Sequence, residues 1–111
     1  MEHILNLHKS PFDLIKSGKK TVEMRLNDEK RSKIKVGDTI KFISREDLST
    51  LIVEVINIES YPTFNELYMK VDNRLLGYDS SKGNDPKDMN QYYSNDLINH
   101  YGVLAIYIRL I

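Results

Sequence analysis

The most regular pattern of apolar and polar positions lies between residues 21 and 26. The apolar residues Val22, Met24 and Leu26 stand two positions apart, and polar residues occupy the positions between them. Side chains of an extended chain point alternately to its two faces, so this spacing predicts a strand with one buried and one exposed face. The same alternation recurs at residues 103–110, which predict a final strand.

Three further segments are predicted to be strands. Residues 51–58 are almost continuously apolar, which is typical of a strand near the centre of a sheet. Residues 39–44 follow a Val-Gly-Asp turn at 36–38 and precede a polar hairpin loop at 45–50. Near the N-terminal end, residues 3–8 predict a short strand of weak periodicity.

A helix is expected directly after the first strand. Ser10 can cap its N-terminus, and Pro11 suits the first helical position because proline lacks an N–H. Asp13 follows three residues after the cap, as in a capping box. We expect the helix to continue to Ser17, since Gly18 can adopt the left-handed conformation that commonly ends a helix.

Two more helices are expected in the second half of the chain. Thr63 and Glu66 form a capping box, and Ser94 can cap a shorter helix that ends before Gly102. The first of these helices should bury four side chains at helical spacing, namely Phe64, Leu67, Tyr68 and Val71. Between the two helices, residues 72–91 predict a long loop with one helical turn beginning at Pro86, and loops of this length are often functional or mobile.

These elements predict an α+β fold built around a small sheet or barrel. Five or six strands are interrupted by three or four short helices, with no repeat and no linker. A chain of 111 residues has room for one hydrophobic core, so we expect a single domain over residues 1–111.

Composition narrows the classes of function. The chain has no cysteine, which excludes disulfides and cysteine-based metal sites, and no apolar run long enough to span a bilayer. We therefore expect a cytoplasmic protein without a membrane partner. The 16 basic and 16 acidic residues balance, but residues 1–45 carry 11 basic and 6 acidic residues and residues 46–111 carry 5 and 10. This asymmetry is compatible with a nucleic-acid-binding side and equally with two halves that pair in the fold.

Candidate chemistry concentrates at the strand that begins near residue 21. Glu23 and Arg25 project from the same face about 7 Å apart, and Lys20 precedes them on a turn from which it can reach that face. Such a cluster can form a positively biased pocket in which Glu23 orients the two cations or accepts a proton. The alternative is an ordinary ion pair on an exposed strand.

These residues carry a resemblance to a known family. The segment from Gly18 to Arg25, GKKTVEMR, resembles the G-x-K-x-x-E-x-R signature of the ASCH domain, a member of the PUA-like superfamily, at all four fixed positions. The order of the predicted elements is also similar over most of the chain. The resemblance implies a PUA-like β-barrel of five or six strands with short flanking helices. It also implies an RNA-binding cleft lined by Lys20, Glu23 and Arg25.

Some bacterial enzymes that resemble this family hydrolyse the amide of acetylated cytidine with a lysine, a threonine nucleophile and a distant glutamate. Lys20 matches their lysine, but Glu23 occupies the position of their threonine, and Thr21 lies two residues earlier. A carboxylate in place of the hydroxyl nucleophile means that this activity does not carry over.

Three functions remain open from the sequence. The first is binding of RNA or a nucleotide fragment, with Lys19, Lys20 and Arg25 contacting phosphates and a tyrosine, Tyr93 or its neighbour Tyr92, stacking on a base. The second is hydrolysis of RNA or a modified nucleoside, with Lys20 and Glu23 as acid and base. The third is binding of a small molecule or a protein by a regulator.

No metal site or cofactor is expected. The three histidines, His3, His8 and His100, lack the spacing of a preformed metal site. The sequence also contains no phosphate-binding loop and no dinucleotide fingerprint.

Overall fold

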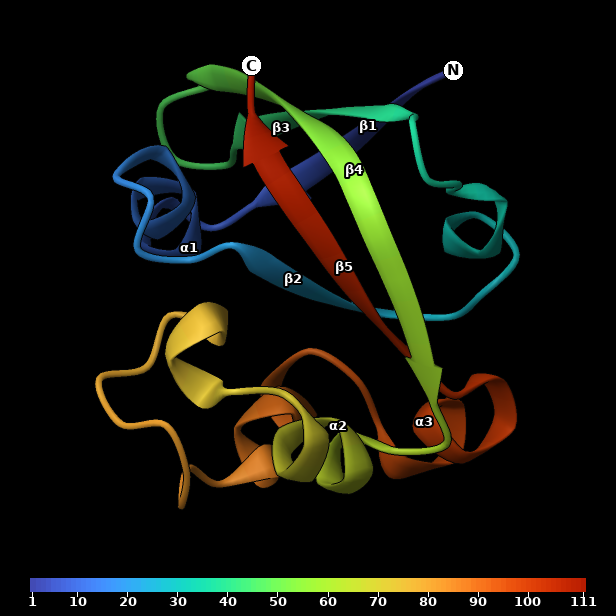
Figure 1. Cartoon of the computed structure of the whole chain (residues 1–111). Coiled ribbons are helices and arrows are strands. Elements are labelled where there is room, and N and C mark those ends of the chain that lie inside the picture. The colour runs from blue at the N-terminus through green and yellow to red at the C-terminus, as the bar shows by residue number, and fades with distance from the viewer.

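The protein folds into a five-stranded sheet and a set of short helices (Figure 1). The structure is a computed structural model and describes residues 1–111. The strands are β1 (Glu2–Leu7), β2 (Val22–Leu26), β3 (Thr39–Ser44), β4 (Thr50–Tyr61) and β5 (Val103–Leu110). The α-helices are α1 (Lys9–Lys16), α2 (Phe64–Lys70) and α3 (Asn95–Tyr101). Three 3₁₀ turns complete the fold, namely η1 (Arg31–Lys33), η2 (Asn73–Leu76) and η3 (Pro86–Gln91).

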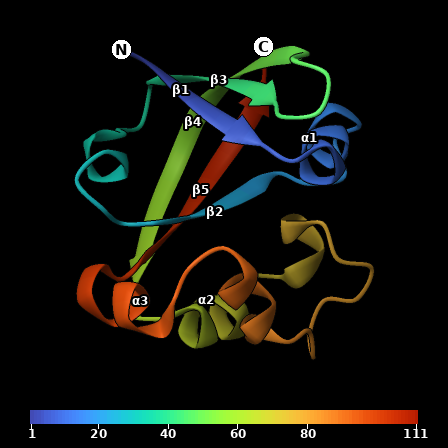
Figure 2. The same ribbon diagram turned by 180° about the vertical axis from the view of Figure 1, so that it is seen from behind.

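The sheet curls into a half-barrel that stays open between its two edge strands. Its order is β1-β3-β4-β5-β2, with β1 parallel to β3 and all other neighbours antiparallel. The edge strands β1 and β2 are not paired with each other, and Figure 2 shows them facing one another across the opening. The open side therefore separates residues 2–7 from residues 22–26.

Two apolar clusters pack on the two sides of the sheet. Inside the half-barrel, α1 contributes Phe12 and Ile15 to a cluster centred on Phe42, Val53 and Ile106. On the other side, β2 and β5 pack against α2, α3 and the segment 73–91, which form the lower layer in Figure 1. Because β2 lies between these two layers, its backbone is fixed from both sides.

The predicted α+β class and the predicted strands are confirmed. The strand at 39–44 has the predicted limits, while β4 extends to Tyr61, three residues beyond the prediction. As predicted, β4 lies at the centre of the sheet, but only Val53 and Val55 on it are buried, because its outer face is not covered. The long loop contains the predicted turn at Pro86 and an additional 3₁₀ turn at 73–76.

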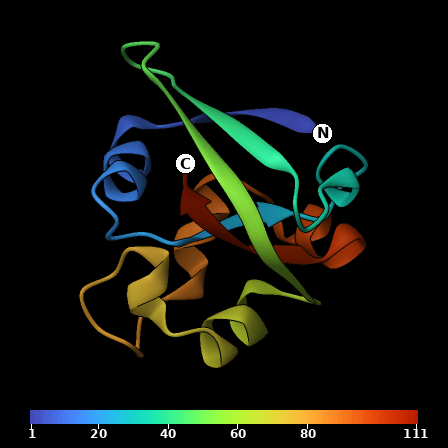
Figure 3. The ribbon, with the colours of Figure 1, turned by 45° about the horizontal axis from the view of Figure 1, so that its top comes forward.

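The predicted cap of α1 is wrong. The helix begins at Lys9, so Ser10 lies within its first turn and caps nothing. The carboxylate of Glu46, in the hairpin between β3 and β4, instead accepts a hydrogen bond of 2.7 Å from the Lys9 N–H. Figure 3 shows this hairpin projecting from the sheet on the same side as α1. A tertiary contact thus supplies the acceptor that the local sequence was expected to supply.

The predicted exposure of β2 is also wrong. All five of its residues are buried, including Glu23 and Arg25 on the face that was expected to be exposed. The curl of the sheet brings the end of β1 to this face, where Arg25 contacts Asn6, and helices cover the other face. The alternative of an ordinary surface ion pair is therefore excluded for these two side chains.

Gly18 has the predicted left-handed conformation, with φ of 82°, and ends α1 just before the cluster. We expect Gly18→Ala to lower the free energy of unfolding by about 1 kcal/mol, because an added Cβ contacts nothing within 4 Å and only backbone strain remains. Gly102→Ala should cost more, since its Cβ would lie 3.0 Å from the carbonyl oxygen of Tyr61. Urea denaturation measures both; equal stability of G18A and the parent protein would contradict the prediction.

Candidate functional site

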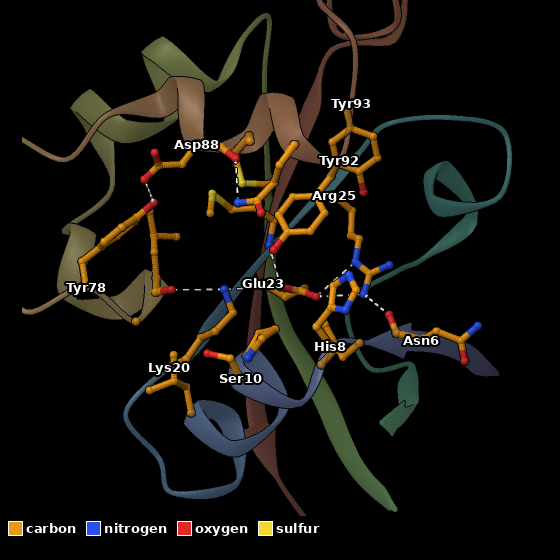
Figure 4. A pocket seen from close by; sticks show the side chains of 18 of the residues that line it. Asn6, His8, Ser10, Lys20, Glu23, Arg25, Tyr78, Asp88, Tyr92 and Tyr93 are labelled. Atoms are coloured by element: carbon orange, nitrogen blue, oxygen red, sulfur yellow. Dashed lines mark hydrogen bonds and ion pairs between the residues drawn. The ribbon is translucent and has the colours of Figure 1, made fainter. Parts of the chain in front are cut away.

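A cavity of about 610 Å³ lies at the opening between β1 and β2 (Figure 4). Its wall combines segments that are far apart in the sequence: the end of β1, α1, β2, η1, the start of the β3–β4 hairpin, and the segment from η2 to Tyr93. Its charged lining residues are Lys20, Glu23, Arg25, Arg31, Arg45 and Asp88.

Glu23 lies between two cations of the signature segment, Lys20 and Arg25. Its Oε1 is 3.3 Å from Lys20 Nζ and accepts a hydrogen bond of 3.1 Å from the Met24 N–H. Its Oε2 accepts a hydrogen bond of 3.0 Å from Arg25 Nε and also lies 3.0 Å from Arg25 Nη2. Both carboxylate oxygens are thus occupied by donors.

Backbone carbonyl groups hold the two cations from their outer sides. Lys20 Nζ donates to the carbonyl oxygen of Leu76 at 3.1 Å, and Arg25 Nη2 donates to that of Asn6 at 2.7 Å. The Arg25 contact crosses the opening of the half-barrel, from β2 to β1. The three charged side chains therefore have fixed positions before any ligand binds.

The cluster is buried and carries a net positive charge. Lys20, Glu23 and Arg25 are 6%, 4% and 8% exposed, and two cations face one carboxylate. Burial disfavours the charged form of Glu23, but the charges of Arg25 and Lys20 outweigh it and hold the pKa of the carboxyl below its ordinary value. Glu23 is therefore ionised at neutral pH, and one positive charge in the cluster remains uncompensated.

Aromatic side chains form a second part of the cavity wall. Tyr92 and Tyr93 both line the cavity; Tyr92 is 47% exposed, whereas the ring of Tyr93 stacks on Phe64 at a centroid distance of 6.2 Å. The ring of His8 lies 5.9 Å from that of Tyr92. The sequence left open which of the two tyrosines faces the cavity; Tyr92 presents the more exposed ring, and the predicted contact of Tyr93 with a ligand stays a prediction.

On the Lys20 side of the cavity, the hydroxyl groups of two tyrosines, Tyr78 and Tyr68, contact each other. The hydroxyl of Tyr78 donates to the Asp88 carboxylate at 3.1 Å and is 2.7 Å from the hydroxyl of Tyr68. Burial, followed by the hydrogen bond with Tyr78, raises the pKa of Tyr68 well above its usual range. In Figure 4, Lys20, Tyr78 and Asp88 lie on one side of Glu23, and Arg25, His8 and Asn6 lie on the other.

The remaining predicted residue, Lys19, does not line the cavity. Its side chain is exposed, and its Nζ is 3.4 Å from a carboxylate oxygen of Asp79. Thr21 lies outside the lining too, and its N–H donates to the carbonyl oxygen of Leu75. Lys20, Glu23 and Arg25 are the predicted charged residues that the fold brings together.

Arg31, Arg45 and Asp88 also line the cavity and were not predicted from the sequence. They belong to three separate segments, and none lies in a recognisable motif. The only available signal was the excess of basic residues before position 46, which includes both arginines.

No group of three histidine or carboxylate side chains is placed to hold a metal ion. His3 instead contacts Asp38, with 2.8 Å between Nε2 and Oδ2. Contacts from His3 and from the Lys35 N–H lower the pKa of Asp38 to about 2.

None of the helices is long and apolar enough to cross a membrane.

Comparisons with known proteins agree with the observed fold. The model of the ASCH domain family matches residues 5–111. The crystal structure of hypothetical protein PH0355 is 34% identical in sequence over 100% of both chains, with a TM-score of 0.84. The solution structure of protein PF0455 from Pyrococcus furiosus is 33% identical over 100% of this chain and 98% of that chain, with a TM-score of 0.76.

A more distant neighbour shows the fold alone. The crystal structure of ASCH from Zymomonas mobilis is 18% identical, with a TM-score of 0.70, over 97% of this chain and 66% of that chain. No curated protein sequence matches this chain.

Proposed function

The chain belongs to the ASCH domain family, which is generally thought to bind RNA, and we propose that it holds RNA or a nucleotide fragment in the cavity between β1 and β2. The observation that carries this proposal is the buried cluster of Lys20, Glu23 and Arg25 with its uncompensated positive charge. Because two buried cations share one carboxylate, the cluster keeps a net positive charge that is costly to bury, and an anionic or strongly accepting ligand would stabilise it.

Donors remain available on both cations of the cluster. Lys20 Nζ has three N–H donors and contacts two acceptors, Glu23 and Leu76. Arg25 uses Nε and Nη2 for Glu23 and Asn6, which leaves the two N–H donors of Nη1 for a ligand. Phosphate oxygens and base carbonyl groups both match such donors.

The size and lining of the cavity favour a single nucleotide unit over a duplex. A volume of about 610 Å³ lies within the range of small-molecule sites, roughly 300–1,000 Å³. Tyr92 offers an exposed ring for stacking, the usual way in which unpaired bases are bound. We therefore expect the ligand to be an unpaired nucleotide of RNA or a free nucleotide.

The contacts of Glu23 favour binding over hydrolysis. A general base needs an accessible lone pair and a pKa near the working pH. Both oxygens of Glu23 accept from donors, and its pKa is lowered. The role that fits these contacts is positioning of Lys20 and Arg25.

The test is the affinity of purified protein for a short single-stranded RNA, measured by fluorescence anisotropy. We expect Lys20→Met to weaken binding about tenfold, the effect of losing one hydrogen bond to a charged group, roughly 1.5 kcal/mol. Methionine keeps most of the volume of the side chain and leaves Glu23 paired with Arg25.

Lys70→Met is the matched control, because Lys70 is an exposed lysine at the end of α2 outside the cavity. It should bind RNA like the parent protein. If K20M and K70M both bind like the parent protein, or if the parent protein binds no RNA or nucleotide, the proposed function is wrong.

A further inference from the structure

Three arginine side chains gather at one end of the cavity. Arg25 reaches the carbonyl oxygen of Asn6, near the end of β1. The N–H of Arg45 donates to the carbonyl oxygen of Leu7 at 2.8 Å, which places Arg45 beside the same end of β1. Arg31 lies on η1, five residues after the end of β2, and lines the same cavity; the ribbon of η1 lies on the Arg25 side of Glu23 in Figure 4. We call these three residues the arginine end.

Arg45 and Arg31 have unused donors in addition to the free Nη1 of Arg25. Arg45 is exposed and forms no ion pair in the structure. Arg31 pairs with Asp28 through Nη1 at 2.6 Å, but its buried Nε has no hydrogen-bond partner. A buried donor without a partner is uncommon and costly, so a ligand acceptor at this position would be stabilising.

The opposite end of the cavity has a different chemistry. Lys20 is its single cation, and Nζ already contacts Glu23 and the carbonyl oxygen of Leu76. Tyr78 and the Asp88 carboxylate also line this end. The carboxylate would repel a phosphate group, whereas it can accept hydrogen bonds from the amino or imino groups of a base.

We infer that the arginine end is a phosphate subsite, in which Arg31 and Arg45 bind the phosphate of a nucleotide whose base points toward Lys20. This inference rests on the proposed function and assigns the orientation of the ligand within the cavity. Guanidinium groups suit this role because their planar N–H donors match phosphate oxygens in pairs. The exposed ring of Tyr92, next to His8 on this side of Glu23, lies within reach of the intervening sugar or base.

The experiment compares ligands with and without the phosphate group. Isothermal titration calorimetry measures the affinity of the parent protein for the four nucleoside 5′-monophosphates and the four corresponding nucleosides. A dinucleoside monophosphate for the best base shows whether a phosphodiester of RNA replaces the terminal phosphate. We expect the best nucleotide or dinucleotide to bind about tenfold tighter than its nucleoside, since a phosphate contact is charge-assisted.

Two variants test the assignment to the arginine end. Arg45→Ala and Arg31→Ala should each reduce this preference for the phosphorylated ligand severalfold while leaving nucleoside affinity within about twofold. Lys20→Met should weaken nucleotide and nucleoside binding by the same factor. Arg109→Ala, which removes an exposed arginine of β5 outside this cavity, should leave both affinities unchanged. Circular dichroism checks that each variant is folded, and R45A removes an exposed side chain that forms no ion pair.

Failures of the two proposals give different results. If the parent protein binds nucleosides and their phosphates equally well, the phosphate subsite is wrong and the nucleotide cavity stands. The subsite is also wrong if R45A and R31A keep the preference for phosphate, whether or not K20M removes it. If neither nucleotides, nucleosides nor RNA bind to the parent protein, both proposals fail.

Discussion

Replacing Glu23 with alanine is expected to lower the free energy of unfolding by about 3–5 kcal/mol, the usual cost of removing one partner from a buried ion pair. The substitution leaves Lys20 and Arg25 next to one another in a site where all three residues are less than a tenth exposed. It also removes the acceptor of the Met24 N–H on the unpaired edge of β2. Urea denaturation followed by circular dichroism measures the effect.

Glu54→Ala is the matched control for this variant. Glu54 also pairs with an arginine, Arg109, but that arginine is largely exposed. An exposed pair contributes only about 0–1 kcal/mol, so E54A should stay close to the parent protein. Should E23A not fold at all, Glu23→Gln keeps the shape and one acceptor oxygen and should show a smaller loss. An E23A protein as stable as E54A would mean that the three side chains do not form one buried unit.

The pH dependence of stability measures what the charge of Glu23 contributes, when the parent protein is compared with E23Q. A carboxyl whose pKa is lower in the folded protein than in the unfolded chain contributes stability above its ordinary pKa, 4.5. This contribution is lost as the pH falls through the lower pKa of the folded state. The difference in stability between the parent protein and E23Q should therefore be largest near neutral pH and shrink below about pH 4. Asp38, whose pKa is also lowered, is present in both proteins and cancels.

Stability alone does not explain a buried cluster of this kind. Buried ion pairs recover little more than their own desolvation cost, and apolar residues of similar volume often give equal or higher stability. The half-barrel already has an apolar interior in which Phe42, Val53 and Ile106 are fully buried. The proposed function accounts for two cations and one carboxylate at its opening, since it gives them a ligand to bind.

The local sequence predicted the elements of the fold well but not what covers them. Alternation at residues 22–26 identifies the strand and its two faces, because this pattern depends only on neighbours in the sequence. Burial of the polar face depends on the curl of the sheet, which brings the end of β1 within hydrogen-bond distance of Arg25 on β2. Similarly, Ser10 has the chemistry of a helix cap, but the hairpin carries Glu46 to the helix terminus and the helix begins one residue before Ser10.

Only the residues of the candidate site that lie in one short segment could be predicted from the sequence. Lys20, Glu23 and Arg25 lie within six residues, so their spacing and the resemblance to the family signature identify them together. Arg31, Arg45 and Asp88 reach the cavity from three other segments, and nothing in their local sequence distinguishes them from other surface charges. The more exposed ring could not be assigned either, since the contact of Tyr93 with Phe64 joins residues far apart in the chain.

Arg25→Lys should lower the free energy of unfolding by about 2–3 kcal/mol although the charge is kept. The guanidinium joins two partners at once, since Nε donates to Glu23 and Nη2 donates to the carbonyl oxygen of Asn6. A single ammonium group lacks this planar fork and cannot keep both contacts in the same geometry. One hydrogen bond from a charged donor contributes roughly 1.5–3 kcal/mol, and a buried acceptor left without a donor adds to the loss.

The loss should be local to the opening of the half-barrel, because no backbone hydrogen bond joins β1 to β2 and the Arg25 side chain bridges them. Hydrogen exchange should therefore accelerate at β1 in R25K more than at the central strands β3 and β4. Arg109→Lys, in an exposed pair with Glu54, should change neither stability nor exchange. Equal acceleration in all strands would show that Arg25 acts on global stability alone, and unchanged stability would show that the contact with Asn6 contributes little. In either case Arg25 would not be the side chain that closes the open edge of the sheet.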